Sequence, residues 1–179
     1  MTNRKKLVTE MGRIDRDAFA QSQKLPLVVV LDNVRSLHNV GSVFRTSDAF
    51  RVECIMLCGI TATPPSAEIH KTALGAEDVV DWKYYESTMD AVAELRSQGY
   101  KIYSIELCQG SIALQDFDTA PGERYAVVLG NEVKGVQQDV VDASDGAIEI
   151  PQFGTKHSLN VSVTAGMVIW EFAKKLGLV

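Results

Sequence analysis

Three polar stretches of this 179-residue chain each follow a short apolar run and combine residue types suited to holding a cofactor and acting on a substrate. The first contains Asn39, Gly41 and Arg45. An asparagine that caps a helix, free backbone N–H groups near a glycine and a nearby guanidinium could together hold an anion. The same residues would also suit an ordinary helix N-terminus with a surface arginine, so this stretch leaves both interpretations open.

The second stretch runs from Leu129 to Gly135 and includes Gly130 and Glu132. A glycine directly after a strand allows the backbone to approach a ligand closely. The carboxylate of Glu132 could accept a hydrogen bond from a ligand or hold Arg45. An ordinary turn between a strand and a helix would also explain the pattern. The glycine spacing matches neither a Walker loop nor a dinucleotide-binding motif.

The third stretch begins where an apolar run ends at Ile150 and Pro151, and it carries Ser158 and Asn160 into a helix. Ser158 is a suitable cap for that helix. Polar residues are dense in this helix, which must also bury apolar side chains, and polar groups in such a position need partners. A bound ligand or a second copy of the chain would supply them.

The elements that must position these stretches alternate along the chain. Continuous apolar runs predict strands that are buried on both faces, and helices between them indicate a doubly wound α/β fold with a parallel sheet. Ligands bind at the carboxyl ends of the strands in such sheets, where all three stretches begin. Strands are expected at 27–31, 54–58, 79–84 (an edge strand), 101–105, 125–129 and 147–150, and helices at 4–22 (ended by Pro26), 40–50, 67–74, 88–98, 136–141 and 159–176.

The composition is that of an ordinary globular protein. The chain is 46% hydrophobic and 23% charged, and its length fits one domain with a sizeable core. No apolar run approaches the roughly 20 residues that span a bilayer, and the polar, basic N-terminus has no signal-peptide pattern. We therefore expect a cytoplasmic protein without a membrane segment.

The three cysteines argue against disulfides, and Cys54 and Cys58 are expected to be buried, reduced strand residues. Their odd number argues against a disulfide framework, and Cys54 and Cys58 lie within an apolar run that predicts a strand. A metal site would need a further histidine or cysteine at ligand spacing. None follows, so we expect no metal.

The charge is unevenly distributed. The net charge of −5 counts against a nucleic-acid partner, because proteins that bind phosphates usually carry a basic surface. Basic residues nevertheless cluster before residue 25, and acidic residues accumulate in the second half. A basic arm on an acidic body is compatible with RNA binding, and a solvated charged helix remains an equal alternative.

Together and in this order, the three stretches resemble the motifs of the SPOUT class of RNA methyltransferases. Within that class, residues of roughly 26–176 resemble the SpoU (TrmH) family of ribose 2′-O-methyltransferases. The motifs that carry the resemblance are Asn39-x-Gly41-x-x-x-Arg45, Leu129-Gly130-Asn131-Glu132-x-x-Gly135, and Ile150-Pro151 followed by Ser158-Leu159-Asn160-Val161-Ser162.

The resemblance implies an architecture that the residue patterns alone could not reveal. The expected fold is α/β, with a mostly parallel sheet flanked by helices and a deep C-terminal trefoil knot formed after about Tyr125. It also implies a homodimer whose site is completed by both subunits. Residues 1–25 would form a basic N-terminal helical arm, and residues 26–179 a single methyltransferase domain.

The resemblance also assigns roles within the site. S-adenosyl-L-methionine would be the cofactor, and Arg45 would be the central catalytic residue. Deprotonating an arginine side chain near neutral pH costs on the order of 8 kcal/mol, so we expect Arg45 to stay charged, bind a phosphate and stabilise the developing alkoxide. The helping catalytic residues would be Asn39, Glu132, Ser158 and Asn160, and the cofactor would contact Leu129, Gly130, Asn131, Ile150, Pro151, Ser158 and Leu159.

Several questions stay open from the sequence. The substrate would be tRNA or rRNA, with a slight preference for tRNA. His157 lies beside Ser158 and could act as a general base, and His38 lies beside Asn39 and could touch RNA. His70 is expected on a surface helix. The alternatives are a non-catalytic RNA-binding protein of the same fold, an ordinary doubly wound nucleotide-dependent enzyme, and a SPOUT enzyme that methylates a base.

Overall fold

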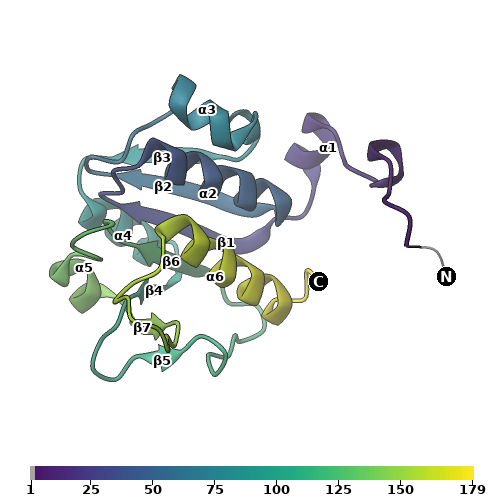
Figure 1. Cartoon of the computed structure of the whole chain (residues 1–179). Coiled ribbons are helices and arrows are strands. Elements are labelled where there is room, and N and C mark those ends of the chain that lie inside the picture. Colours follow the sequence, from purple (N-terminus) through teal and green to yellow (C-terminus); the bar gives the residue numbers. More distant parts are fainter. Residues whose placement is uncertain (1–2) are drawn as a thin grey trace.

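The computed structural model describes residues 3–179 and shows a single sheet between two layers of helices (Figure 1). In the described residues the sheet has seven strands in the order β3-β2-β1-β6-β4-β7-β5, and all its strand pairs are parallel. The strands are β1 (Leu25–Asp32), β2 (Val52–Cys58), β3 (Trp82–Tyr85), β4 (Lys101–Ile105), β5 (Ile112–Ala113), β6 (Tyr125–Leu129) and β7 (Gly146–Glu149).

The helices divide between the two faces of the sheet. One core packs α2, α3 and α6 against β1, β2 and β6, and the other packs α4 and α5 against the opposite face. The helical elements of residues 3–179 are η1 (Val8–Glu10), α1 (Arg16–Gln21), α2 (Leu37–Ala49), α3 (Ala67–Ala73), η2 (Ala76–Asp78), α4 (Thr88–Ser97), α5 (Gln138–Ala143) and α6 (Val161–Lys175).

The central strands explain why the apolar runs are continuous. Leu27, Val29 and Leu31 of β1 pack into one core, while Val28 and Val30 pack into the other. Both faces of the strand are therefore buried, as a parallel sheet requires. The predicted parallel α/β sheet is confirmed, and the predicted edge strand is β3.

The topology brings distant loops together at one edge of the sheet. On one side of β1 lies β2, followed by β3. The other side of β1 pairs with β6, so the strand order reverses between β1 and β6. Leu31 of β1 pairs with Leu129 of β6, so Asp32 and Gly130 leave the sheet at the same level. Loops that diverge at such a reversal of strand order form a crevice.

The helix predicted over 4–22 is wrong. Only η1 and α1 are helical there, separated by Gly12 with a φ of 60° and by Asp15, whose side chain caps α1 by accepting the N–H of Ala18 at 2.8 Å. Pro26 also does not end that helix but lies within β1. The N-terminal residues extend away from the sheet (Figure 1), so tertiary packing does not stabilise a longer helix.

No helix among residues 3–179 is both long and apolar enough to cross a membrane. The three cysteines are free thiols, and Cys58 is buried on β2 as predicted for a strand residue.

Candidate functional site

The loops after β4, β6 and β7 enclose a cavity of about 460 Å³. Its apolar walls come from the strand ends and from the start of α6, and its polar lining comes from the loops. Six of the seven residues predicted to contact a cofactor line it, namely Leu129, Gly130, Asn131, Ile150, Ser158 and Leu159. Pro151 does not line the cavity.

The loop after β6 closes on itself at the cavity. Asn131 and Gly135 exchange two backbone hydrogen bonds, of 3.0 Å and 2.9 Å. A Cβ atom on Gly130 would collide with the backbone of Gly135 and Val136. Glycine is therefore required at position 130 by the tight loop itself. The glycine at this position is therefore explained without a ligand, although the sequence suggested that it makes room for one.

Glu132 joins this loop to the loop after β1. Its carboxylate accepts the backbone N–H of Arg35 at 2.9 Å and of Ser36 at 3.0 Å. It also accepts the side-chain amide of Asn39 at 3.0 Å. The Asn39 oxygen in turn accepts the amide of Asn160 at 3.2 Å. Three predicted catalytic residues, one from each polar stretch, thus form one hydrogen-bonded chain.

Arg45 is not part of this chain. It lies exposed on α2, and within residues 3–179 its side chain makes no hydrogen bond or ion pair. Glu132 therefore does not hold Arg45, the side chain considered for it from the sequence, but binds Asn39. Ser158 is exposed at the cavity rim.

Both predicted helix caps are wrong by a few residues. Ser36, not Asn39, caps α2, and Asn160, not Ser158, caps α6 by accepting the N–H groups of Ser162 and Val163. Asn39 lies within the first turn, where its side chain reaches Glu132.

Gly41 does not form an anion site at the helix start. It lies inside α2, where a Cβ atom would collide with Thr72 and the backbone of Ile69 on α3. Its lack of a side chain allows α2 and α3 to pack closely.

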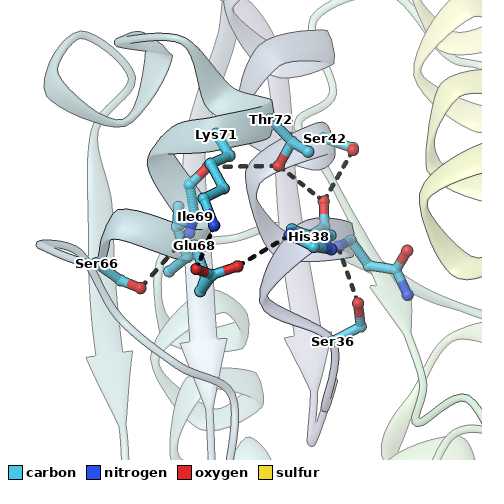
Figure 2. Close-up of polar contacts among 9 residues, drawn as sticks. Ser36, His38, Ser42, Ser66, Glu68, Ile69, Lys71 and Thr72 are labelled. Atoms are coloured by element: carbon cyan, nitrogen blue, oxygen red, sulfur yellow. Dashed lines mark hydrogen bonds and ion pairs between the residues drawn. The ribbon is translucent and has the colours of Figure 1, made fainter.

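His38 lies on the outer surface of α2, beside α3 (Figure 2). Its Nε2 is 3.1 Å from Glu68, which also binds Lys71 at 2.5 Å. The His38 carbonyl accepts the hydroxyls of Ser42 and Thr72. His38 does not line the cavity, whereas His157 does. His70 is exposed on α3, as predicted.

Asp32 is a structural residue of the site that none of the three polar motifs includes. This fully buried carboxylate accepts hydrogen bonds from Asn33, from the hydroxyl of Thr88 and from both the backbone and side chain of Gln137, at 2.6–2.8 Å. Its hydrogen bonds therefore connect β1 to the start of α4 and to Gln137, which follows the loop after β6. The sequence does place a charged residue at the end of an otherwise apolar strand. This pattern indicates a buried carboxylate, which needs hydrogen-bond donors around it.

Replacing Glu132 by glutamine is expected to destabilise the fold near neutral pH but not in acid. Burial acts to raise the pKa of Glu132, but the N–H groups of Arg35 and Ser36 and the amide of Asn39 outweigh it and hold the pKa below its ordinary value. Such a carboxylate stabilises the fold above its unfolded pKa of about 4.3, and this stabilisation is lost as the pH falls through the lower folded value.

Urea unfolding of wild type and Glu132→Gln at about pH 7 and about pH 3 measures this effect. The difference in free energy of unfolding should shrink in acid. The control is Glu86→Gln, at an exposed position. A difference that stayed constant across the pH range would contradict the assigned role of the carboxylate.

Residues 26–170 match the SpoU rRNA Methylase family. The tRNA (guanosine(18)-2′-O)-methyltransferase of Aquifex aeolicus is 31% identical over 158 residues, which cover 87% of this chain and 72% of the relative. The crystal structure of the A. aeolicus TrmH/SpoU tRNA modifying enzyme has a TM-score of 0.78 at 26% identity, over 91% of this chain and 81% of that one.

A second solved structure is the AdoMet-bound rRNA methyltransferase of Sinorhizobium meliloti. It has a TM-score of 0.78 at 27% identity, over 89% of this chain. The present chain spans only 59% of that protein's length, so the Sinorhizobium protein has a substantial part without a counterpart in this sequence.

Proposed function

Because the chain belongs to the SpoU rRNA methylase family, we propose that it transfers a methyl group from S-adenosylmethionine to a ribose 2′-hydroxyl of tRNA or rRNA. The observation that carries the proposal is the convergence of the three polar stretches. The second and third supply the cavity lining, and the hydrogen-bonded chain of Glu132, Asn39 and Asn160 links the first to it.

The cavity suits S-adenosylmethionine in size and chemistry. Its volume of about 460 Å³ falls within the range of about 300–1,000 Å³ for small-molecule sites. Leu129, Ile150 and Leu159 provide apolar walls for an adenine ring, and the loop backbone provides polar groups for its edge. The exposed hydroxyl of Ser158 is available to the amino-acid part of the cofactor or to a ribose.

Arg45 is proposed to act on the substrate. When bound, the cofactor supplies a methyl group on a sulfonium, whose thioether leaving group is neutral and needs no acid. The chain must therefore position the 2′-hydroxyl and stabilise the negative charge that develops on it. Arg45 is exposed on α2, where its charged guanidinium can bind a phosphate in bidentate fashion and stabilise that oxygen.

Asn39, Glu132 and Asn160 are proposed to hold the substrate side of the site in place. The amide nitrogen of Asn39 donates to Glu132, and its oxygen accepts from Asn160, which fixes the orientation of the amide. This linkage fixes the start of α2, and hence Arg45, relative to the cavity loops.

We also propose a homodimer. Val163, Met167 and Trp170 are between 43% and 49% exposed on one side of α6. Exposed apolar side chains continue at the cavity rim with Leu159, and a contiguous patch of this kind commonly marks an interface. A second copy of the chain would cover the patch and come close to the cavity.

The trefoil knot is a further part of the proposal. The segment between β4 and β6 packs on the C-terminal helix: the rings of Phe117 and Phe172 are 5.3 Å apart, and Thr119 donates to the carbonyl of Lys175 at 3.1 Å. These contacts support a path in which the chain after β7 passes under the segment between β4 and β6 before it forms α6.

The N-terminal arm is proposed as a separate RNA-binding segment attached to the methyltransferase domain. Its exposed residues include Arg13 and Arg16, and Arg16 is 3.0 Å from Asp78 on the body. Basic side chains on a projecting arm can bind RNA phosphates even when the whole chain is acidic.

Narrowing the cavity at its rim should weaken cofactor binding. In Leu159→Trp the larger ring would occupy space at the partly exposed rim, and we expect the Kd for S-adenosylmethionine to rise at least about tenfold, since the ligand would lose part of its apolar contact there. Titration calorimetry measures the Kd. The matched control is Ile60→Trp, at a position 66% exposed and outside the cavity lining.

Equal binding by Leu159→Trp and wild type would place the cofactor elsewhere. No binding by wild-type protein at millimolar S-adenosylmethionine would instead favour the non-catalytic RNA-binding alternative.

A further inference from the structure

The lining of the cofactor cavity carries more acidic than basic side chains. Glu106, Glu132 and Glu149 contribute carboxylates, whereas Lys134 is the only lysine or arginine in the lining. No ion pair involving any of the three glutamates is found among residues 3–179. Within these residues their negative charge is therefore not offset by an ion pair.

Glu106 is held at the cavity by neutral donors. It follows the end of β4, and its carboxylate accepts the backbone N–H of Leu107 at 2.9 Å and of Val136 at 3.1 Å. A Cβ atom on Gly135 would collide with this carboxylate. The loop after β6 therefore closes against Glu106, and the charge stays in a partly buried position.

Glu149, the last residue of β7, adds another carboxylate to the cavity lining. Its carboxylate accepts only a neutral hydroxyl, that of Ser111, at 2.6 Å. Glu132 is instead directed to the loop after β1 through Arg35, Ser36 and Asn39. Glu106 and Glu149 are thus the two acidic side chains of the lining that the proposed mechanism does not use.

We propose that Glu106, supported by Glu149, makes the cavity prefer the cationic methyl donor to its neutral product. This inference rests on the proposed function. Methyl transfer breaks the S–CH3 bond, leaves its electron pair on sulfur, forms the O2′–CH3 bond and releases the hydroxyl proton to water. The cofactor thereby loses one positive charge while the rest of its structure is unchanged.

The loss of that charge weakens the attraction to the cavity at the moment when the product must leave. Apolar and hydrogen-bonding contacts are shared by S-adenosylmethionine and S-adenosylhomocysteine, so the ratio of their Kd values isolates the effect of the charge. A carboxylate that lines a partly solvated site would contribute about fivefold to that ratio.

Titration calorimetry with both ligands tests the inference on wild type, Glu106→Gln and Glu149→Gln. We expect Glu106→Gln to weaken binding of S-adenosylmethionine about fivefold and to leave binding of S-adenosylhomocysteine nearly unchanged. Glu149→Gln should act in the same direction and keeps the test valid if the first variant folds poorly. The control is Glu86→Gln, which makes the same change in net charge after β3 and outside the cavity lining.

The possible outcomes separate this inference from the proposed function. If both ligands bind and their Kd ratio is the same in wild type and both cavity variants, the charge preference is wrong and the cofactor site stands. If neither ligand binds the wild-type protein, the proposed function fails, and this inference fails with it.

Discussion

Arg45→Lys is expected to lower kcat/KM for RNA methylation by about 100-fold while leaving the Kd for S-adenosylmethionine within about twofold. Lysine keeps the positive charge but loses the planar fork that binds a phosphate with two hydrogen bonds. Removing one donor that stabilises a developing oxyanion typically costs about 10²–10³ in rate. Cofactor binding should be spared because Arg45 does not line the cavity.

The control for this variant is Arg96→Lys, an equivalent change at an exposed arginine on α4 that does not line the cavity. Single-turnover rates with saturating cofactor separate the chemical step from binding. Near-wild-type rates for Arg45→Lys would show that charge alone suffices and would refute the bidentate role.

Gly130→Ala is expected to weaken S-adenosylmethionine binding by about 100-fold. The added methyl group has no space beside the backbone of Gly135 and Val136, so the loop after β6 must open. A loss of affinity of about 100-fold corresponds to about 2.7 kcal/mol, which is the scale of the apolar and hydrogen-bonding contacts that a displaced loop would no longer make. Equilibrium dialysis with labelled cofactor measures the loss, and circular dichroism checks that the fold is retained.

Gly154→Ala is the matched control for Gly130→Ala. Gly154 lies in the loop after β7, and no atom lies within 4 Å of a Cβ atom built there. The control should bind like wild type. If Gly130→Ala also bound like wild type, the closed loop would not be needed for the cofactor site.

Six of the seven strands of the described residues and most helices could be predicted because each depends on local patterns. The continuous apolar run of β1 indicated burial on both faces. Because ligands bind at the carboxyl ends of parallel strands, the three polar stretches were expected to meet at one edge of the sheet. The convergence of Glu132, Asn39 and Asn160 confirms that placement.

The details that could not be predicted depend on contacts between distant segments. Asp32 bonds to Gln137, 105 residues later in the chain, and no local pattern reveals such a partner. Gly41 is required by the approach of α3 and not by a ligand. The two-residue strand β5 was missed because it is defined only by pairing with β7.

The helix caps were misplaced for a related reason. Ser36 and Asn160 cap their helices, although Asn39 and Ser158 were equally suitable by residue type. The side chain of Asn39 was not available, because its partner Glu132 arrives from another strand.

The most direct test of the central claim is to identify the methylated nucleoside. The wild-type chain would be incubated with S-adenosylmethionine labelled in the methyl group and with bulk tRNA or rRNA from a strain that lacks this gene, and the RNA would then be digested to nucleosides. We expect the label to be recovered in a 2′-O-methylated nucleoside. Label recovered in a methylated base, or no label from a chain that binds the cofactor, would contradict it.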